Sequence, residues 1–126
     1  MVTKQFSGSA EDADLRRADS LGREIFSDVA NKWALLIIEM LGEGTLRFSE
    51  LRSRVEGISH KMLTQNLRML ERNGLLVRTV HPTVPPRVEY TLTEAGHGLR
   101  ATVDGMCEWT YRYFQHIESA RRQFGG

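Results

Sequence analysis

Cysteine is nearly absent from this chain of 126 residues, and long apolar runs are absent altogether. The single cysteine, Cys107, excludes a disulfide within the chain and any zinc site that needs several cysteines. No apolar run approaches the ~20 residues that cross a bilayer, and the polar segment 1–10 lacks the apolar centre of a signal peptide. We therefore expect a cytoplasmic protein with no membrane partner.

Groupings of residues that are typical of catalysis are also missing. The histidines are scattered, at positions 60, 81, 97 and 116, and none pairs with cysteine or carboxylates at ligand spacing. No glycine loop of the kind that holds phosphates is present. The sequence thus argues against an enzyme and predicts neither a cofactor nor a bound metal.

Positive charge is in small excess overall, but it is unevenly distributed along the chain. The net charge is +1. The segment 47–87 holds eight basic and three acidic residues, a sum of +5, whereas the segment 1–26 holds four basic and five acidic residues, a sum of −1. A local concentration of basic residues is typical of a phosphate-binding surface.

Length and composition, with 40% hydrophobic and 26% charged residues, predict one globular domain with its own core. We expect residues 1–12 to form a disordered tail and residues 13–126 to form the domain. The spacing of apolar residues predicts a first helix over 14–30. A second helix over 32–41, capped by Asn31, is apolar nearly all round, so it should be buried on most sides.

A helix-turn-helix is predicted over residues 49–73. Its first helix spans 49–55, with Ser49 as the expected cap, and follows an extended link at 46–48. A tight turn that contains glycine, at 56–58, leads into the second helix.

That second helix, residues 59–73, carries the clearest functional signal. Ser59 can cap its first amides, and Gly74 can adopt the left-handed turn that ends it. Its predicted apolar face comprises Met62, Leu63, Leu67, Met69 and Leu70, with Asn66 as the one polar member. Its other face comprises His60, Lys61, Thr64, Gln65, Arg68, Glu71 and Arg72. These donors and positive charges suit base edges and phosphates, although a plain surface helix also carries a polar face.

The segment 75–92 predicts a β-hairpin, in which strands at 75–81 and 87–92 flank a stiff, proline-rich tip. A hairpin directly after a helix-turn-helix is the wing of a winged-helix domain. The predicted fold is therefore mainly α with a β-hairpin wing. Arg78 and Arg87 lie on or near the wing and can reach phosphates or a minor groove; solvated arginines on an ordinary hairpin are the alternative.

The last predicted helix spans 93–123 and is capped by Thr93. At 100° steps its apolar residues form one stripe: Leu99, Val103, Met106, Cys107, Trp109, Tyr113, Phe114 and Ile117. A domain of this size cannot cover a helix ~45 Å long with its own core, so the stripe fits a partner surface. A symmetric dimer is the simplest partner, and the alternative is that the first helix folds back over the stripe.

Six stretches of the chain, within residues 20–115, resemble the HxlR-type transcriptional regulators, a winged-helix group related in shape to the MarR regulators. The stretches are Asn31–Ile38, Arg47–Leu51, Gly57–Arg68, Asn73–Thr79, Pro85–Thr93, and Leu99 with Cys107–Trp109. The resemblance implies a homodimer that binds an operator through two recognition helices. It also implies long N- and C-terminal dimerisation helices, and control by a small molecule or by oxidation.

One departure from that family concerns its redox chemistry. Many members begin the first helix with a cysteine, often followed by proline, about a dozen residues before the Lys-Trp pair. Here Ser20 and Leu21 occupy those positions, so we expect no thiol switch of that kind. Cys107 lies on the apolar stripe of the last helix, where a buried, inert thiol is expected.

Double-stranded DNA is the partner that the residues and the resemblance predict. Base contacts are expected from Lys61, Thr64, Gln65 and Arg68 in a major groove. Backbone contacts are expected from Arg47, Ser59, His60, Arg78 and Arg87. In a dimer, two such helices would lie about 34–36 Å apart, or a multiple of that, so the operator would be an inverted repeat.

The predicted function is a homodimeric regulator of transcription, and repression is the expected mode. A pocket between the two long helices is predicted to hold a small apolar or aromatic effector, although the same residues often form simple dimer core. Its predicted lining comprises Leu21, Phe26, Trp33, Met106, Trp109, Tyr113 and Phe114. The alternative function is a winged helix that binds proteins and has no specific affinity for DNA.

Overall fold

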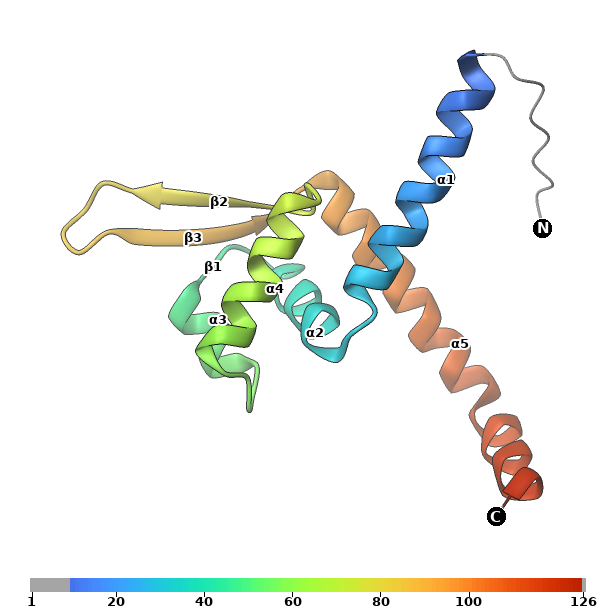
Figure 1. The fold of residues 1–126 in the computed structure, drawn as a ribbon. Helices are drawn as coiled ribbons and strands as arrows, with labels where there is room; N and C mark the ends of the chain where they lie inside the picture. The colour runs from blue at the N-terminus through green and yellow to red at the C-terminus, as the bar shows by residue number, and fades with distance from the viewer. Residues whose placement is uncertain (1–9, 126) are drawn as a thin grey trace.

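The computed structural model describes residues 10–125, which form a winged helix-turn-helix with two long helices attached (Figure 1). In chain order the elements are α1 (Ala10–Val29), α2 (Lys32–Leu41), β1 (Leu46–Arg47), α3 (Phe48–Arg54), α4 (His60–Arg72), β2 (Leu76–His81), β3 (Arg87–Leu92) and α5 (Glu94–Gly125). The predicted fold class, mainly α with a β-hairpin wing, is confirmed.

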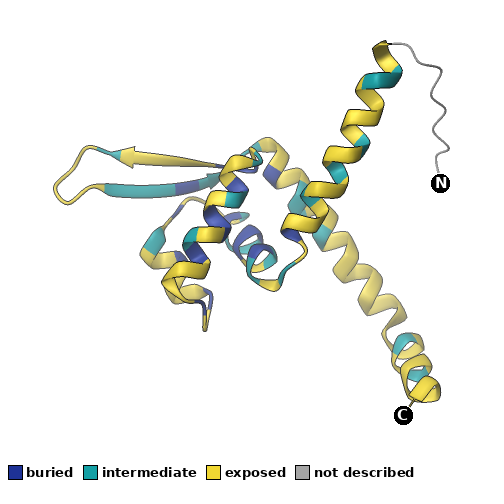
Figure 2. Cartoon of the chain, viewed as in Figure 1, coloured by how far each residue is buried: buried dark blue, intermediate teal, exposed yellow. Residues whose placement is uncertain are grey.

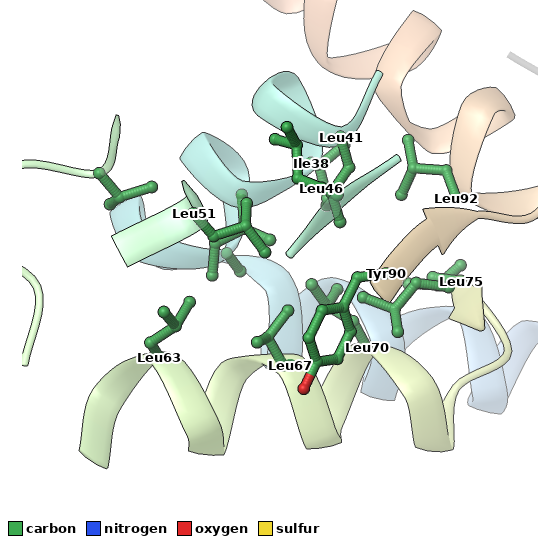
Figure 3. Packing of buried hydrophobic residues seen from close by; sticks show 14 of the residues in the cluster. Ile38, Leu41, Leu46, Leu51, Leu63, Leu67, Leu70, Leu75, Tyr90 and Leu92 are labelled. Carbon is green, nitrogen blue, oxygen red and sulfur yellow. The ribbon is translucent and has the colours of Figure 1, made fainter. Parts of the chain in front are cut away.

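The core lies where α2, α3 and α4 meet the sheet. Figure 3 shows Ile38 and Leu41 of α2 facing Leu51 of α3, with Leu63 and Leu70 of α4 below them. All five side chains are at most 1% exposed. Burial of each such side chain contributes about 1.5–3 kcal/mol, so this cluster fixes the position of α4 relative to α2 and α3.

The helix α2 has the predicted bounds and the predicted cap, because the side chain of Asn31 accepts a hydrogen bond of 2.9 Å from the amide of Ala34. It is less buried than its composition suggests, since Leu36 is 40% exposed. The cap predicted for α3 is wrong. That helix begins at Phe48, and the carboxylate of Glu50 accepts a hydrogen bond of 2.9 Å from the amide of Arg47, which leaves Ser49 inside the first turn.

The sheet has one strand more than the predicted hairpin. Residues 46–47, expected as a link, form β1, which pairs antiparallel with β3 in the order β1-β3-β2. Leu46 is opposite Tyr90 in this register. Because side chains alternate along a strand, Tyr90 and Leu92 both point into the core. Figure 3 shows Tyr90 beside Leu67 and Leu70, so Tyr90 anchors the wing to α4.

The helices α1 and α5 extend away from this core (Figure 1), and Figure 2 shows that nearly all of their surface is exposed. Val29 is the one buried residue of α1, and Gly96 is the one buried residue of α5. α1 begins at Ala10, so the predicted tail is corrected for residues 10–12; residues 1–9 lie outside the described residues. Among residues 10–125, no helix is long and apolar enough to cross a membrane.

Candidate nucleic-acid interface

The helix α4 is fixed at both ends as the sequence predicts. At its start, Oγ of Ser59 accepts a hydrogen bond of 3.1 Å from the amide of Met62. At its end, Gly74 has a φ of +71°, a conformation that glycine adopts without a steric cost. These two caps define where the recognition-type helix begins and ends.

One face of α4 is buried, and its one polar residue is satisfied within the helix. The buried residues are Leu63, Asn66, Leu67 and Leu70. Nδ2 of Asn66 donates a hydrogen bond of 2.9 Å to the carbonyl oxygen of Met62, which explains how an amide is tolerated there. The predicted apolar face is wrong at Met62, whose side chain is 37% exposed.

The opposite face of α4 presents polar side chains to solvent. Lys61, Gln65 and Arg68 are exposed, and none of them forms an ion pair or side-chain hydrogen bond with another residue in 10–125. Thr64 is half-buried, and its hydroxyl donates a hydrogen bond of 2.9 Å to the carbonyl oxygen of His60. The ring of His60 lies 4.8 Å from that of Phe48 in α3, so this imidazole is held between the two helices.

A basic slot separates α4 from the wing. Its volume is about 340 Å³, and its lining comprises Thr64, Leu67, Arg68, Glu71, Arg78 and Tyr90. Arg78 reaches this slot because it is opposite Tyr90 in the β2–β3 register, so both side chains leave the same face of the sheet. The structure therefore brings two predicted DNA contacts, Arg68 and Arg78, to one slot.

A second basic groove lies between the start of α3 and the tip of the wing. Its volume is about 550 Å³, and its lining comprises Arg47, Phe48, Ser49, Thr83, Val84, Pro85, Pro86, Arg87 and Val88. Arg47 and Arg87, forty residues apart in the sequence, are thus neighbours. Ser49 and Thr83 are polar lining residues that the sequence did not single out as contacts, because their proximity depends on how the wing folds back toward α3.

Residues 28–118 match the family described as HxlR-like helix-turn-helix, which is most of the chain. The chain belongs to this family. An uncharacterized HTH-type transcriptional regulator of Methanothermobacter thermautotrophicus is 45% identical over 94 residues, which cover 75% of this chain and 72% of the relative. The curated relatives are thus regulators of transcription, which agrees with the expectation that the protein is not an enzyme.

Two solved structures have a similar fold. The reduced form of the transcriptional regulator YodB from B. subtilis is 38% identical, with a TM-score of 0.66 over 72% of this chain and 89% of that one. The redox regulator HypR in its reduced form is 36% identical, with a TM-score of 0.69 over 77% of this chain and 96% of that one. This HxlR-family chain is thus a helix-turn-helix transcriptional regulator with a winged-helix fold.

In this HxlR-family chain, most residues of the predicted dimer and effector region are exposed on α1 and α5. The exposed members are Leu21, Phe26, Met106, Trp109, Tyr113 and Phe114, at 44–64%. The rings of Trp109 and Tyr113 contact each other, with 5.9 Å between their centroids. Trp33 lies elsewhere, since it packs against the hydrophobic core near Gly57 and carries the ammonium of Lys32 over its ring at 4.5 Å.

An apolar groove of about 510 Å³ lies where α1, α2 and α5 converge. It is lined by Phe26, Val29, Ala30, Asn31, Lys32, Leu35, Leu99, Thr102, Val103 and Met106. Of the residues predicted for an effector pocket, the structure brings Phe26 and Met106 to this groove. The aromatic side chains of Trp109, Tyr113 and Phe114 lie further along α5.

The expectation of a buried thiol is wrong for the single chain, because Cys107 is exposed on α5. The prediction relied on the position of Cys107 in the apolar stripe of α5. An apolar helix face is buried only when another surface covers it. In residues 10–125 no group of three or more potential metal-binding side chains is present.

Proposed function

We propose that this regulator binds DNA specifically as a homodimer, with α4 in the major groove, and that it represses transcription. The observation that carries the proposal is the set of three exposed, unpaired donors on one face of α4, namely Lys61, Gln65 and Arg68. An arginine can bind guanine, and a glutamine can bind adenine, through two hydrogen bonds each. Side chains already tied up in ion pairs would be less available for such contacts.

The remaining predicted residues are assigned to the DNA backbone. Arg78 faces the slot beside Arg68, so it can bind a phosphate that flanks the bases read by α4. Arg47 and Arg87 line the groove at the wing tip and are proposed to bind a second stretch of backbone. Ser59 and His60 stand at the start of α4, where free amides and the helix dipole attract a phosphate.

Dimerisation is proposed because α1 lacks enough contacts to be stable in a single chain. A helix of 20 residues with one buried side chain would be marginal in water. Apolar side chains are exposed along α1 and α5, including Phe26, Trp109 and Phe114. Two copies that pair these helices would bury both surfaces and present two α4 helices to an inverted repeat.

Effector control is proposed for the apolar groove between α1, α2 and α5. Its volume of about 510 Å³ falls within the usual range for small-molecule sites. The lining is apolar, which suits a small apolar or aromatic molecule. Because α2 belongs to the DNA-binding core while α1 and α5 belong to the proposed dimer, a ligand here would alter the spacing of the two α4 helices.

The test is DNA binding by Arg68→Ala. We expect the wild type to give a saturable, salt-sensitive gel shift with the promoter fragment upstream of its own gene. Loss of a two-bond contact to a base costs about 1–3 kcal/mol and relaxes sequence preference at that position. Unchanged affinity and preference in Arg68→Ala would refute the assignment of this face. The alternative, a module that binds proteins, predicts no saturable shift for the wild type.

A further inference from the structure

The outer face of the wing carries one carboxylate among three basic side chains. Successive side chains of β3 alternate between the two faces of the sheet, and Tyr90 faces the core. Arg87 and Glu89 therefore share the opposite face. The register places Arg47 of β1 opposite Glu89, and His81 of β2 opposite Arg87.

Two of these side chains contact the same oxygen atom. Oε1 of Glu89 lies 2.9 Å from Nε2 of His81 and 2.9 Å from Nε of Arg87. The Glu89 side chain is 25% exposed, so water screens these contacts less than it would on an open surface. Oε1 is therefore shared by two nitrogens on neighbouring strands.

The contact between Arg87 and Glu89 is close but poorly aligned. Nε of Arg87 is buried and has no hydrogen-bond partner, although the carboxylate oxygen lies within 2.9 Å of it. The N–H bond therefore does not point at the oxygen, and attraction between the charges holds the pair. Once Arg87 has turned away from Glu89, a phosphate can accept from its guanidinium group a charge-assisted hydrogen bond that Glu89 does not provide.

We propose that Glu89 is a positioning residue of the wing, which holds Arg87 in the free protein and releases it to a DNA phosphate. The proposal rests on the function proposed above. The carboxylate and the phosphate compete for one guanidinium group, so Glu89 lowers the affinity for DNA by the cost of separating the pair. His81 contacts the same carboxylate oxygen, and it keeps Glu89 partnered after Arg87 has left.

The test is the effect of Glu89→Gln on the binding of two short duplexes, the promoter fragment and a scrambled sequence of equal length. We expect affinity for both to rise roughly two- to tenfold, because a partly exposed ion pair no longer has to be broken. Both duplexes should respond alike, since a phosphate contact does not depend on sequence. Because Arg87 binds the phosphate in both complexes, the number of phosphate contacts, and with it the slope of log K against log salt, should be almost unchanged.

Removing any negative charge near DNA raises affinity somewhat, so a matched control is needed. Glu71 lines the slot beside Arg68 and forms no ion pair with another residue in 10–125, and Glu71→Gln removes the same charge. The distinguishing measurement is the coupling to Arg87. In an Arg87→Gln background, Glu89→Gln should keep only a general gain of the size that Glu71→Gln gives, whereas Glu71→Gln should keep the effect that it has in the wild type.

The outcomes separate the inference from the function on which it rests. A wild type with no saturable binding overturns both. A wild type that binds, with Glu89→Gln binding equally or more weakly, overturns the inference alone, and so does an equal gain in the Arg87→Gln background. If Glu89→Gln fails to fold by circular dichroism, Glu89→Asp keeps the charge but withdraws the oxygen by one methylene, and a smaller gain that depends on Arg87 is expected.

Discussion

Single residues set the close contacts that join the winged domain to the long helix α5. A Cβ atom at Gly96 would run into the carbonyl oxygen of Leu75, which is part of the backbone and cannot move aside cheaply. Gly98, two residues further on, has open space around its Cα atom. The same turn of α5 therefore has no room for a side chain at position 96 and ample room for one at position 98.

We expect Gly96→Ala to destabilise the protein by about 1–3 kcal/mol, since it overpacks a junction formed by backbone. Gly98→Ala is the matched control, and it should stabilise the protein by about 0.5–1 kcal/mol because alanine favours a helix over glycine. Urea denaturation followed by circular dichroism measures both changes. Equal effects of the two substitutions would contradict this account of the junction.

The titration of Glu39, on α2, is clearly altered. Burial raises the pKa of its carboxyl above the usual 4.5, and the neighbouring Asp104 carboxyl raises this pKa further. Arg100 opposes the shift, with its Nε 3.5 Å from Oε2 of Glu39, while Oε1 is buried without a hydrogen-bond partner. Arg100 also donates a hydrogen bond of 3.3 Å to the carbonyl oxygen of Gly42.

The raised pKa of Glu39 predicts a pH dependence of stability. The folded state binds this proton more tightly than the unfolded state, so the group contributes stability below pH 4.5. That contribution is lost as pH rises through the higher, folded pKa. Glu39→Gln should therefore flatten the fall in stability with pH above 4.5, as measured by urea denaturation at a series of pH values. Glu43→Gln, which removes an exposed carboxylate in the next turn, controls for the loss of one charge, and a similar flattening there would argue against a specific role for Glu39.

At the scale of elements, the sequence predicts most helices and strands because their signals are local. Asn31, Ser59 and Thr93 each cap the helix that they are expected to cap. The strand β1 escapes prediction because two residues are too short for any periodicity. Its existence depends on pairing with β3, which is more than 40 residues further along the chain.

The candidate site shows the same division between local and long-range information. The polar face of α4 is readable from helical spacing, which places Lys61, Gln65 and Arg68 together. Helical spacing cannot predict where the two arginines of the wing point. Arg78 and Arg87 lie on opposite faces of the sheet, and the register of that sheet is known only from the fold. The contact of Arg87 with Glu89 likewise depends on how the side chains pack.

Thr93 links the end of α4 to the start of α5 through one hydroxyl group. Its Oγ1 accepts a hydrogen bond of 3.1 Å from the amide of Gly96, which caps α5. The same hydroxyl donates a hydrogen bond of 2.6 Å to the carbonyl oxygen of Gly74, where α4 has just ended. The recognition-type helix and the long helix are therefore tied together at the base of the wing.

Thr93→Val keeps the shape of this side chain but removes both hydrogen bonds. We expect a loss of about 1–2 kcal/mol, the usual value for a helix cap with a buried partner. Thr93→Ser keeps the hydroxyl and should lose much less. The measurement is the midpoint of urea denaturation at constant m-value, and equal losses for valine and serine would show that the methyl group matters more than the bonds.

At the scale of the whole molecule, the exposed apolar stripes on α1 and α5 bear on the oligomeric state of the protein. The winged domain has its own core, but α1 has one buried residue, and α5 exposes Trp109, Tyr113 and Phe114. An exposed apolar surface of this kind is typical of a subunit rather than a monomer. The exposed Cys107 belongs to the same surface, so its environment depends on whether a partner covers it.

The proposed dimer can be tested with one pair of substitutions on α5. Phe114 lies on the apolar stripe and is 52% exposed, whereas Tyr111 is 87% exposed and points away from the stripe at helical spacing. Phe114→Glu would place a charge in the proposed interface, at a cost of roughly 2–4 kcal/mol or more in association. Tyr111→Glu adds the same charge outside the interface and should leave association unchanged.

Light scattering after size exclusion decides between these expectations, because one chain has a mass of 14.4 kDa. We expect the wild type and Tyr111→Glu to have twice this mass, and Phe114→Glu to shift toward the mass of one chain. Only a dimer can place two α4 helices on an inverted repeat, so Phe114→Glu should also bind a full operator no better than a half-site. A dimeric Phe114→Glu together with a monomeric Tyr111→Glu would place the interface on another face of α5.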